Sequence, residues 1–252
     1  VGKGHEVKIF RGDLLERKSV EEFFDLNPDL STFIHLAGSF YGELSDVIAK
    51  NTLASANLID FITLRKNVRL IFTSTGAVYG NTGSKPAVED QKLTPITTYG
   101  FAKKWAEELF LHYVNLYSIE LVTLRLPSVY GPGNDKGVIH SWIKSVKESS
   151  TITLNGDGGQ LRSFLHINDL IEVIDRFISH AATGTYNVAG RERLSLSELA
   201  NIFSAHLEFE TVLAPQDNRL QSMVLDIDKV SRTLDWTPRY YIEDFIQGQT
   251  KL

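Results

Sequence analysis

Two residues one helical turn apart could exchange a proton with a bound ligand. Tyr99 opens a segment with helical spacing, and Lys103 follows four positions later, which puts both on one face of the helix. A phenol has a reference pKa of about 10, and a nearby ammonium favours the phenolate by Coulomb attraction. The pair could therefore act as a general base and acid toward a hydroxyl group. The same spacing also arises by chance on ordinary helix surfaces, so the interpretation depends on its context.

A cluster of hydroxyl side chains precedes this pair by about 25 residues. The apolar run 70–72 predicts a strand, and Thr73, Ser74 and Thr75 follow it before a glycine-containing turn. Ligands of open parallel sheets bind beyond the carboxyl ends of the strands, so Thr75 is placed where it could contact a reacting group. The alternative is that these hydroxyls only satisfy backbone groups where the strand ends.

The elements that must position these residues alternate between short apolar runs and longer amphipathic segments. This pattern is typical of a parallel sheet flanked by helices. The predicted strands are 7–10, 32–36, 68–73, 121–126, 151–154, 163–166, 185–188 and 211–213. The predicted helices are 19–26, 43–64, 99–117, 138–147, 167–178, 197–206 and 227–234. The later elements are shorter, which predicts a boundary between two lobes near Pro132.

Composition narrows the classes of partner. The 252 residues are 42% hydrophobic and 23% charged, as in ordinary globular proteins. A formal net charge of −5 provides no basic field for nucleic acid or an anionic membrane surface, so neither partner is expected. The chain has no cysteine, which excludes disulfides and thiolate metal sites, and we predict no metal site. We find neither an apolar run of membrane-spanning length nor a signal peptide, and we expect a cytoplasmic protein.

From about Gly12 to about Phe245 the chain resembles the extended short-chain dehydrogenase/reductase family, in particular its NAD-dependent nucleotide-sugar epimerase/dehydratase branch. Besides the hydroxyl cluster and the Tyr–Lys pair, several stretches match in order. They are Gly12-Asp13-Leu14, His35-Leu36-Ala37-Gly38, Asn51, 125–133, 156–164, Tyr186-Asn187-Val188 and Asp235-Trp236-Thr237-Pro238. The resemblance implies an α/β fold, a Rossmann-type doubly wound parallel sheet with a smaller C-terminal substrate lobe. Residues 1–132 would form the dinucleotide-binding domain, and residues 133–252 mainly the substrate-binding lobe, interleaved with the first.

The resemblance also implies roles for individual residues. Thr75, Tyr99 and Lys103 would be catalytic. The cofactor would be NAD, with NADP not distinguished by the sequence. It would contact Asp13, Leu14, Leu36, Ala37, Gly38, Asn51, Thr73, Ser74, Tyr99, Lys103, Pro127 and Val129. A nucleotide-diphosphate sugar would contact Thr75, Ser128, Arg162 and Arg219. Arginine pairs with phosphate through two parallel donors, which makes Arg162 the candidate diphosphate clamp, whereas Arg219 has an unusual offset for that role. Family members commonly form homodimers through two helices, here 43–64 and 99–117.

The start of the sequence departs from the family pattern. The glycine-rich turn that should follow a first strand is missing, and Gly2 and Gly4 fit a helix exit better than a phosphate cradle. Phe10 leads straight into residues 11–13, which the resemblance assigns to the third strand. The first strand is central in this fold, so we expect the given sequence to omit residues before Val1 and near Phe10. Ser128 and Ser163 stand where the family often has Asn and Asp, changes that concern substrate choice.

The reaction class depends on what accompanies the catalytic residues. Family members that dehydrate their substrate carry an Asp-Glu pair directly after the catalytic Thr, whereas Gly76-Ala77 follows Thr75 here. The resemblance therefore favours an NAD-dependent epimerase that inverts carbon 4 of the sugar through a transient ketosugar, with Tyr99 as the acid and base. An NAD(P)H-dependent ketosugar reductase using the same residues is the alternative. A non-catalytic nucleotide-binding relative is a third, more distant one.

Overall fold

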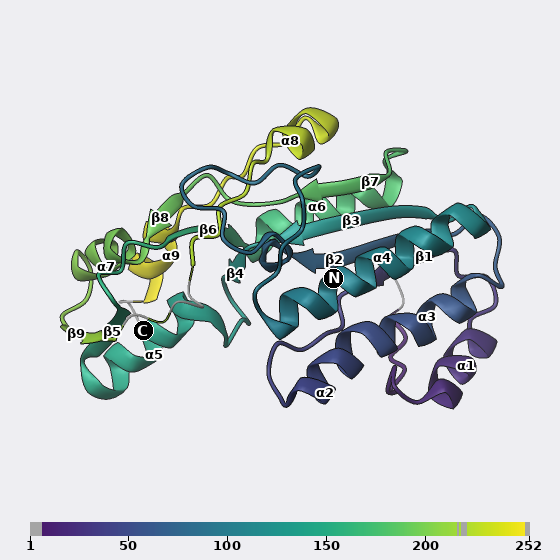
Figure 1. The fold of residues 1–252 in the computed structure, drawn as a ribbon, viewed down its shortest axis with the longest axis horizontal. Helices are drawn as coiled ribbons and strands as arrows, with labels where there is room; N and C mark the ends of the chain where they lie inside the picture. The colour runs from purple at the N-terminus through teal and green to yellow at the C-terminus, as the bar shows by residue number, and fades with distance from the viewer. Residues whose placement is uncertain (1–6, 216, 218–220, 250–252) are drawn as a thin grey trace.

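The computed structural model describes residues 7–215, 217 and 221–249. Its main feature is a four-stranded parallel sheet in the order β1-β2-β3-β7 (Figure 1). The strands are β1 (Thr32–His35), β2 (Arg69–Thr75), β3 (Glu120–Leu126) and β7 (Gly184–Asn187). Every residue of β2 is buried, as expected for a central strand of a sheet covered on both faces. The predicted α/β fold class is confirmed.

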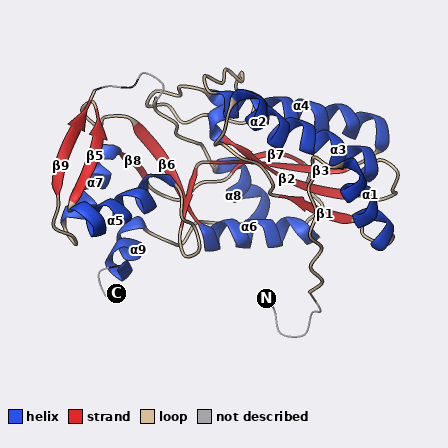
Figure 2. Ribbon diagram, turned by 90° about the horizontal axis from the view of Figure 1, so that it is seen from below, coloured by secondary structure: helices blue, strands red, loops and turns tan. Residues whose placement is uncertain are grey.

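Helices cover both faces of this sheet (Figure 2). On one face lie α1 (Arg17–Leu26), α2 (Leu44–Ile48), α3 (Ala54–Ile62) and α4 (Thr98–Tyr117). On the other lies α6 (Ile167–Ser179), with α8 (Asp228–Leu234) beside it. The first core cluster joins the sheet to α1, α3 and α4, and includes Phe72 and Phe110, whose rings meet edge to face. Another cluster joins the opposite face to α6 through Val173 and Phe177.

A smaller set of elements follows β3. One sheet contains β4 (Ser128–Tyr130), β6 (Leu161–His166) and β8 (Arg193–Ser195), and β5 (Thr151–Asn155) pairs with β9 (Glu210–Ala214). The helices α5 (Gly137–Ser149), α7 (Leu196–Ser204) and α9 (Ile242–Gln249) pack around their own apolar cluster. Because α6 and β7 return to the first sheet, the chain passes between the two parts more than once. The domain limits 1–132 and 133–252 stay a prediction.

A backbone strap ties the two parts together. Leu225 forms a parallel bridge with Ala87, and Met223 forms one with Arg162 of β6. Backbone hydrogen bonds from Ala87 N to Val224 O at 2.9 Å and from Ser163 N to Met223 O at 3.0 Å complete the connection. Residues 222–225 therefore lie between the loop after β2 and the smaller sheet.

Two predictions for the start of the chain are wrong. Residues 7–10 form no strand, and residues 11–13 form none either. Val7 and Ile9 are 63% and 84% exposed, and no strand of the part that the structure describes pairs with them. Alternating apolar residues form a strand only where a partner pairs with them and covers them. The helix exit predicted at Gly2 and Gly4 lies outside the described residues.

The predicted helix 43–64 is interrupted. A π-helical turn, η1 (Ala49–Leu53), separates α2 from α3. Asn51 lies in this turn with its side chain buried, and its Nδ2 donates to Val47 O at 2.7 Å and to Ser39 O at 2.6 Å. Single π-helical turns inside α-helices are frequently found at functional sites. The other helices lie close to their predicted ranges, while β4, β8 and α9 were absent from the prediction.

Candidate active site

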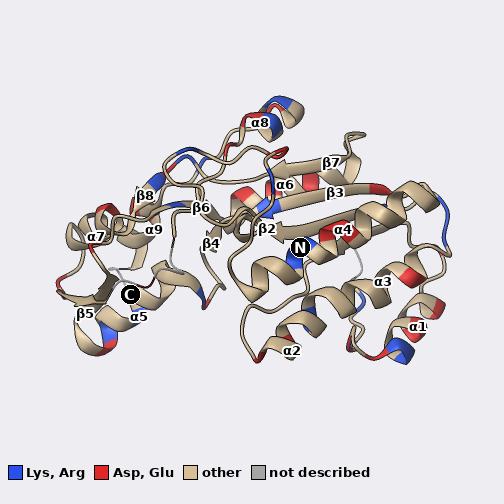
Figure 3. Cartoon of the chain, viewed as in Figure 1, with Lys and Arg blue, Asp and Glu red and all other residues tan. Residues whose placement is uncertain are grey.

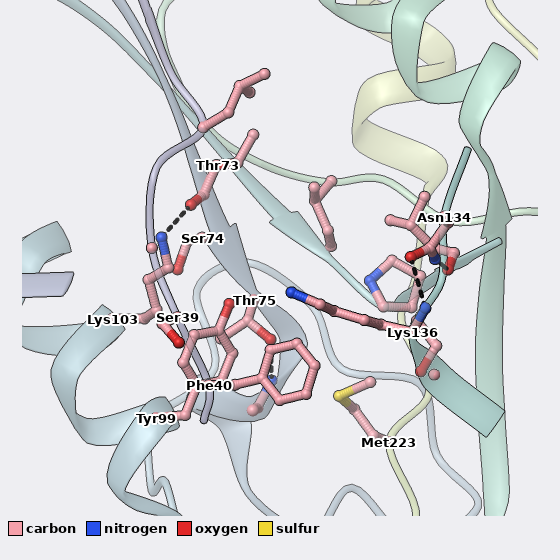
Figure 4. Close-up of a pocket in the computed structure, with 18 of the residues that line it drawn as sticks. Ser39, Phe40, Thr73, Ser74, Thr75, Tyr99, Lys103, Asn134, Lys136 and Met223 are labelled. Atoms are coloured by element: carbon pink, nitrogen blue, oxygen red, sulfur yellow. Dashed lines mark hydrogen bonds between the residues drawn. The ribbon is translucent and has the colours of Figure 1, made fainter. Parts of the chain in front are cut away.

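A cleft of about 450 Å³ opens at the carboxyl ends of β2 and β3 (Figure 4). It is lined by residues that follow β1, by the end of β2, by the start of α4 and by the stretch that follows β3. The lining residues predicted from the sequence are Leu36, Gly38, Thr73, Ser74, Thr75, Tyr99, Lys103, Pro127, Ser128, Val129 and Arg162. The structure therefore brings together the three residues for which a catalytic role is predicted.

Tyr99 lies in the first turn of α4. Thr97 caps this helix by accepting a hydrogen bond from Gly100 N at 3.1 Å. Gly100 lets the helix approach the short helix η2 (Gly76–Tyr79), since a Cβ at this position would lie 2.7 Å from Ala77 O. Burial raises the pKa of the Tyr99 phenol to about 12, and its hydrogen bond with Thr75 offsets part of that rise. The phenol is therefore held beside the hydroxyl group of Thr75.

Lys103 is buried and points toward the end of β2. Its Nζ donates to Thr73 O at 2.9 Å and lies 4.7 Å from the centre of the Phe72 ring. Burial lowers the pKa of Lys103 to about 8, and the nearby Glu107 carboxylate opposes this shift. The predicted lowering of the Tyr99 pKa by Lys103 is not found, because the desolvation of the phenol dominates. Lys103 contacts the strand end and not the phenol.

The residues after β1 form a close-fitting wall near Lys103. A Cβ at Gly38 would lie 2.5 Å from Asn51 Oδ1 and 3.1 Å from Lys103 Nζ, so a side chain here would displace the ends of both neighbouring side chains. Asn51 Oδ1 is buried and accepts no hydrogen bond from the described residues. A buried acceptor without a donor costs about 1–3 kcal/mol, which a ligand donor could relieve. This wall suits the ribose and nicotinamide half of a dinucleotide. Ala37 lies between two wall residues but does not line the cleft.

A second hollow, of about 200 Å³, lies at Asp13 and Leu14, the other residues predicted to contact the cofactor. Asp13 and Leu14 line it together with Phe10, Phe23 and Leu58. An apolar hollow with one carboxylate suits a flat heterocycle such as adenine. The residues predicted to contact the two ends of a dinucleotide therefore lie at two separate hollows of the described structure. A glycine-rich turn that would bind the diphosphate between them is not found within residues 7–215, 217 and 221–249.

Arg162 enters the cleft from β6, on the side of the strap residue Met223. Burial lowers the pKa of Arg162, and its guanidinium forms no ion pair with any residue that the structure describes. A half-buried cation without a counter-ion among the described residues is a suitable partner for an anionic ligand. Arg219, the second predicted arginine, lies outside the described residues.

Sequence reasoning missed eight lining residues. They are Ser39, Phe40, Ala77, Leu126, Asn134, Lys136, Gly137 and Met223. Ser39 and Phe40 directly follow a matched motif and could have been included by extending it. Asn134 and Lys136 lie just beyond the matched stretch 125–133. Met223 carried no signal, since it is brought to the cleft only by the strap.

A buried ion pair between Arg125 of β3 and Glu107 of α4 lies next to the cleft residues Ser74 and Lys103. Arg125 Nη2 donates to Glu107 Oε2 at 2.7 Å, and its Nε donates to Oε1 at 3.1 Å. Ser74 Oγ donates to the same carboxylate. Arg125 Nη1 also donates to the Tyr79 hydroxyl at 2.8 Å. Glu107 lies one turn beyond Lys103 on α4, so this network fixes the helix against β2 and β3.

Neither a metal site nor a membrane span is found in the described ranges. No three His, Asp or Glu residues of those ranges are grouped so that they could bind a metal ion. No helix there combines the length and the apolar character needed to cross a bilayer.

A parallel sheet covered by helices on both faces, with a cleft at the carboxyl ends of its strands, defines an α/β protein of the Rossmann type. The chain belongs to the NAD dependent epimerase/dehydratase family, whose model matches residues 1–189. The resemblance stated from the sequence is therefore confirmed.

Curated relatives and solved structures show a range of activities. The UDP-glucuronate 4-epimerase of Thermodesulfobacterium geofontis is 26% identical over 259 residues, covering 96% of this chain and 78% of the relative. UDP-glucuronic acid decarboxylase 1 of Arabidopsis thaliana is 26% identical over 211 residues, covering 78% and 48%. The structure of UDP-glucuronic acid 4-epimerase from Bacillus cereus, in complex with UDP-glucuronic acid and NAD, superposes with a TM-score of 0.86 at 24% identity, covering 96% and 79%. The chain spans about half to two thirds of the length of several curated relatives that it matches.

The buried ion pair predicts a large stability effect. Glu107→Gln leaves the Arg125 guanidinium buried without its counter-ion, so the free energy of unfolding should fall by about 3–5 kcal/mol. Glu108→Gln is the matched control on the same helix, since Glu108 forms an exposed pair with Lys104 and should cost less than about 1 kcal/mol. Urea denaturation measures both. Equal losses would show that the buried pair does not hold α4 in place.

The lowered pKa of Lys103 predicts a pH dependence of stability. Between pH 8 and 10.5 the unfolded chain keeps the Lys103 proton that the folded chain has lost, so the free energy of unfolding rises with pH in this window. Relative to Lys103→Met, the wild-type protein should gain up to about 1.4 kcal/mol per pH unit. Denaturation of both proteins at several pH values measures this difference. A constant difference would mean that Lys103 titrates normally.

Proposed function

We propose that this protein is an NAD-dependent epimerase that inverts carbon 4 of a UDP-sugar. The observation that carries the proposal is the placement of Thr75, Tyr99 and Lys103 around one cleft at the strand ends. Further support comes from the relatives, several of which are named as 4-epimerases of UDP-sugars.

Each of the three residues has a distinct task in this reaction. Tyr99 would take the proton of the sugar 4-hydroxyl and later return a proton to the 4-oxygen of the ketosugar as the inverted sugar forms. Thr75 holds the same oxygen through the hydroxyl that already bonds the phenol. Lys103, anchored on Thr73 O, keeps a positive charge at the strand end and offers its remaining donors to a ribose hydroxyl. NAD, when bound, would supply the hydride acceptor and a positive charge that favours the phenolate of Tyr99.

The cleft does not provide for dehydration. Removing water from the sugar needs a further acid and base next to the ketosugar. Gly76 and Ala77 follow Thr75, and no Asp or Glu is among the described residues that line the cleft. Tyr99 and Thr75 are the hydrogen-bonded hydroxyl groups of the cleft that could relay a proton to the sugar. A reaction that needs only one proton relay, such as epimerisation at carbon 4, matches this set.

The remaining residues bind cofactor and substrate. Leu36, Gly38, Asn51 and Lys103 would hold the nicotinamide half of NAD, and Asp13 with Leu14 the adenine end. Pro127, Ser128 and Val129 would line the path of the sugar next to the nicotinamide. Arg162 would pair with the diphosphate of the UDP-sugar, since it is a half-buried cation without an ion-pair partner among the described side chains. NADP stays an alternative, because the residues that distinguish the two cofactors follow the family's second strand.

Tyr99→Phe tests the proposal. Without the phenol hydroxyl the interconversion of UDP-sugars should fall by a factor of about 10²–10⁴, while the free energy of unfolding stays close to that of the wild type. Product formation from UDP-glucose and UDP-glucuronate, without added NADH, measures the reaction. Net consumption of NADH or NADPH with a ketosugar would favour the reductase. Nucleotide binding without turnover would favour a non-catalytic protein, and a fully active Tyr99→Phe variant would refute the assigned role.

We further propose a homodimer formed by α2, η1, α3 and α4. Thr52 Oγ1 donates to Ala102 O at 3.0 Å, which holds the two helical segments side by side. Leu44, Leu53, Phe101 and Trp105 are exposed there, at 63%, 50%, 43% and 45%. Trp105→Glu should convert a two-chain species into a one-chain species in light scattering. Ile171→Glu, on α6 across the sheet, is the control that should stay dimeric. A wild-type protein of one-chain mass would contradict the proposal.

A further inference from the structure

The cleft is basic although the protein as a whole is acidic. Charges of both signs are interspersed along the helices (Figure 3), and the net charge is −5. The described residues that line the cleft include Lys103, Lys136 and Arg162 and no carboxylate. Lys103 donates to the Thr73 carbonyl, and Arg162 is the proposed diphosphate partner. Lys136 is the third cation and has no role in the proposed reaction.

The backbone holds Lys136 in place. Asn134 Nδ2 donates to Val129 O at 2.6 Å, and Asn134 Oδ1 accepts from Lys136 N at 3.0 Å. This side chain therefore fastens the loop before α5 to the end of β4. Gly137, which follows with a φ of 85°, turns the chain into the helix. The position of Lys136 is thus set by a hydrogen-bonded turn.

The side chain of Lys136 extends into the cleft (Figure 4). Its Nζ lies 5.9 Å from the ring centre of Phe40 and 5.7 Å from that of Tyr41. The ring of Phe40 in turn lies 5.9 Å from that of Tyr99. No carboxylate of the described residues pairs with this ammonium. Lys136 thus presents a cation on the side of Phe40 and Tyr99, whereas Arg162 enters beside Met223.

We propose that Lys136 binds an anionic group on the sugar, so that the preferred substrates are nucleotide-activated uronic acids. This inference rests on the proposed function, because it assumes that the ligand bound next to Tyr99 is a sugar. A carboxylate on carbon 6 supplies the anion, and an ammonium attracts it without demanding the planar geometry that arginine requires. A neutral hexose offers only a hydroxyl at that place. The diphosphate is the other anion of such a ligand, and the test separates the two.

Binding measurements to three probes make this separation. UDP carries only the diphosphate, UDP-glucose adds a neutral sugar, and UDP-glucuronate adds the carboxylate. Calorimetric titration of the NAD-loaded full chain in the Tyr99→Phe background gives dissociation constants without turnover. The Lys136→Met substitution should weaken UDP-glucuronate binding about 10–100-fold more than UDP-glucose binding, the range for a hydrogen bond to a charged group. Lys136→Arg should retain most of the preference.

The control is Lys144→Met, which removes an exposed lysine of α5 that pairs with Glu148. It should change none of the three constants. Equal weakening of all three probes by Lys136→Met would assign the ammonium to the diphosphate and overturn the proposal. No change, or a parent protein that does not prefer UDP-glucuronate, would overturn it as well. Preferential binding that depends on Lys136, in a wild-type protein that converts no UDP-sugar, would support this inference while refuting the proposed function.

Discussion

The arrangement of the cleft depends on the buried pair of Arg125 and Glu107. Arg125 lies on β3 and Glu107 on α4, and their two-point contact is excluded from water. Two buried charges stabilise a fold only when each is fully paired, so the helix has one allowed position against the sheet. Because Lys103 and Tyr99 lie one and two turns before Glu107, that position also sets where both side chains point. Ser74 adds a third contact to the same carboxylate from β2.

Burial then determines the proton affinities of the site. The pKa of Tyr99 rises to about 12 and that of Lys103 falls to about 8 for the same reason, the loss of water around the charged form. Both shifts favour the neutral groups, and the rise at Tyr99 disfavours the phenolate that base catalysis requires. An added positive charge near the phenol would reverse the balance for Tyr99, which explains why this chemistry suits an oxidised dinucleotide. In the proposed reaction, proton transfer by Tyr99 would therefore depend on the bound cofactor.

The sequence predicted the parts of the structure that depend on local pattern. The strand at 68–73 and the helix at 99–117 follow from apolar periodicity, and the hydroxyls of 73–75 follow from the rule that ligands bind at strand ends. The strand at 7–10 failed because an alternating pattern cannot reveal whether a neighbour will pair with it. The role of Glu107 was invisible because its partner lies 18 positions away on another element. Lys136 and Met223 reach the cleft by a turn and a strap that carry no periodic signal.

The strap of residues 222–225 limits how the protein can admit a ligand. Main-chain hydrogen bonds join it to Ala87 on one side and to Ser163 on the other. The two parts of the chain are therefore connected at that edge of the cleft. A hinge motion that opens the cleft at this edge would have to break several of these hydrogen bonds at once. A substrate would instead enter past the side chains of Phe40 and Lys136, which line the cleft. Selection among substrates would then begin at the entrance of the cleft, before the sugar reaches the Tyr99 phenol.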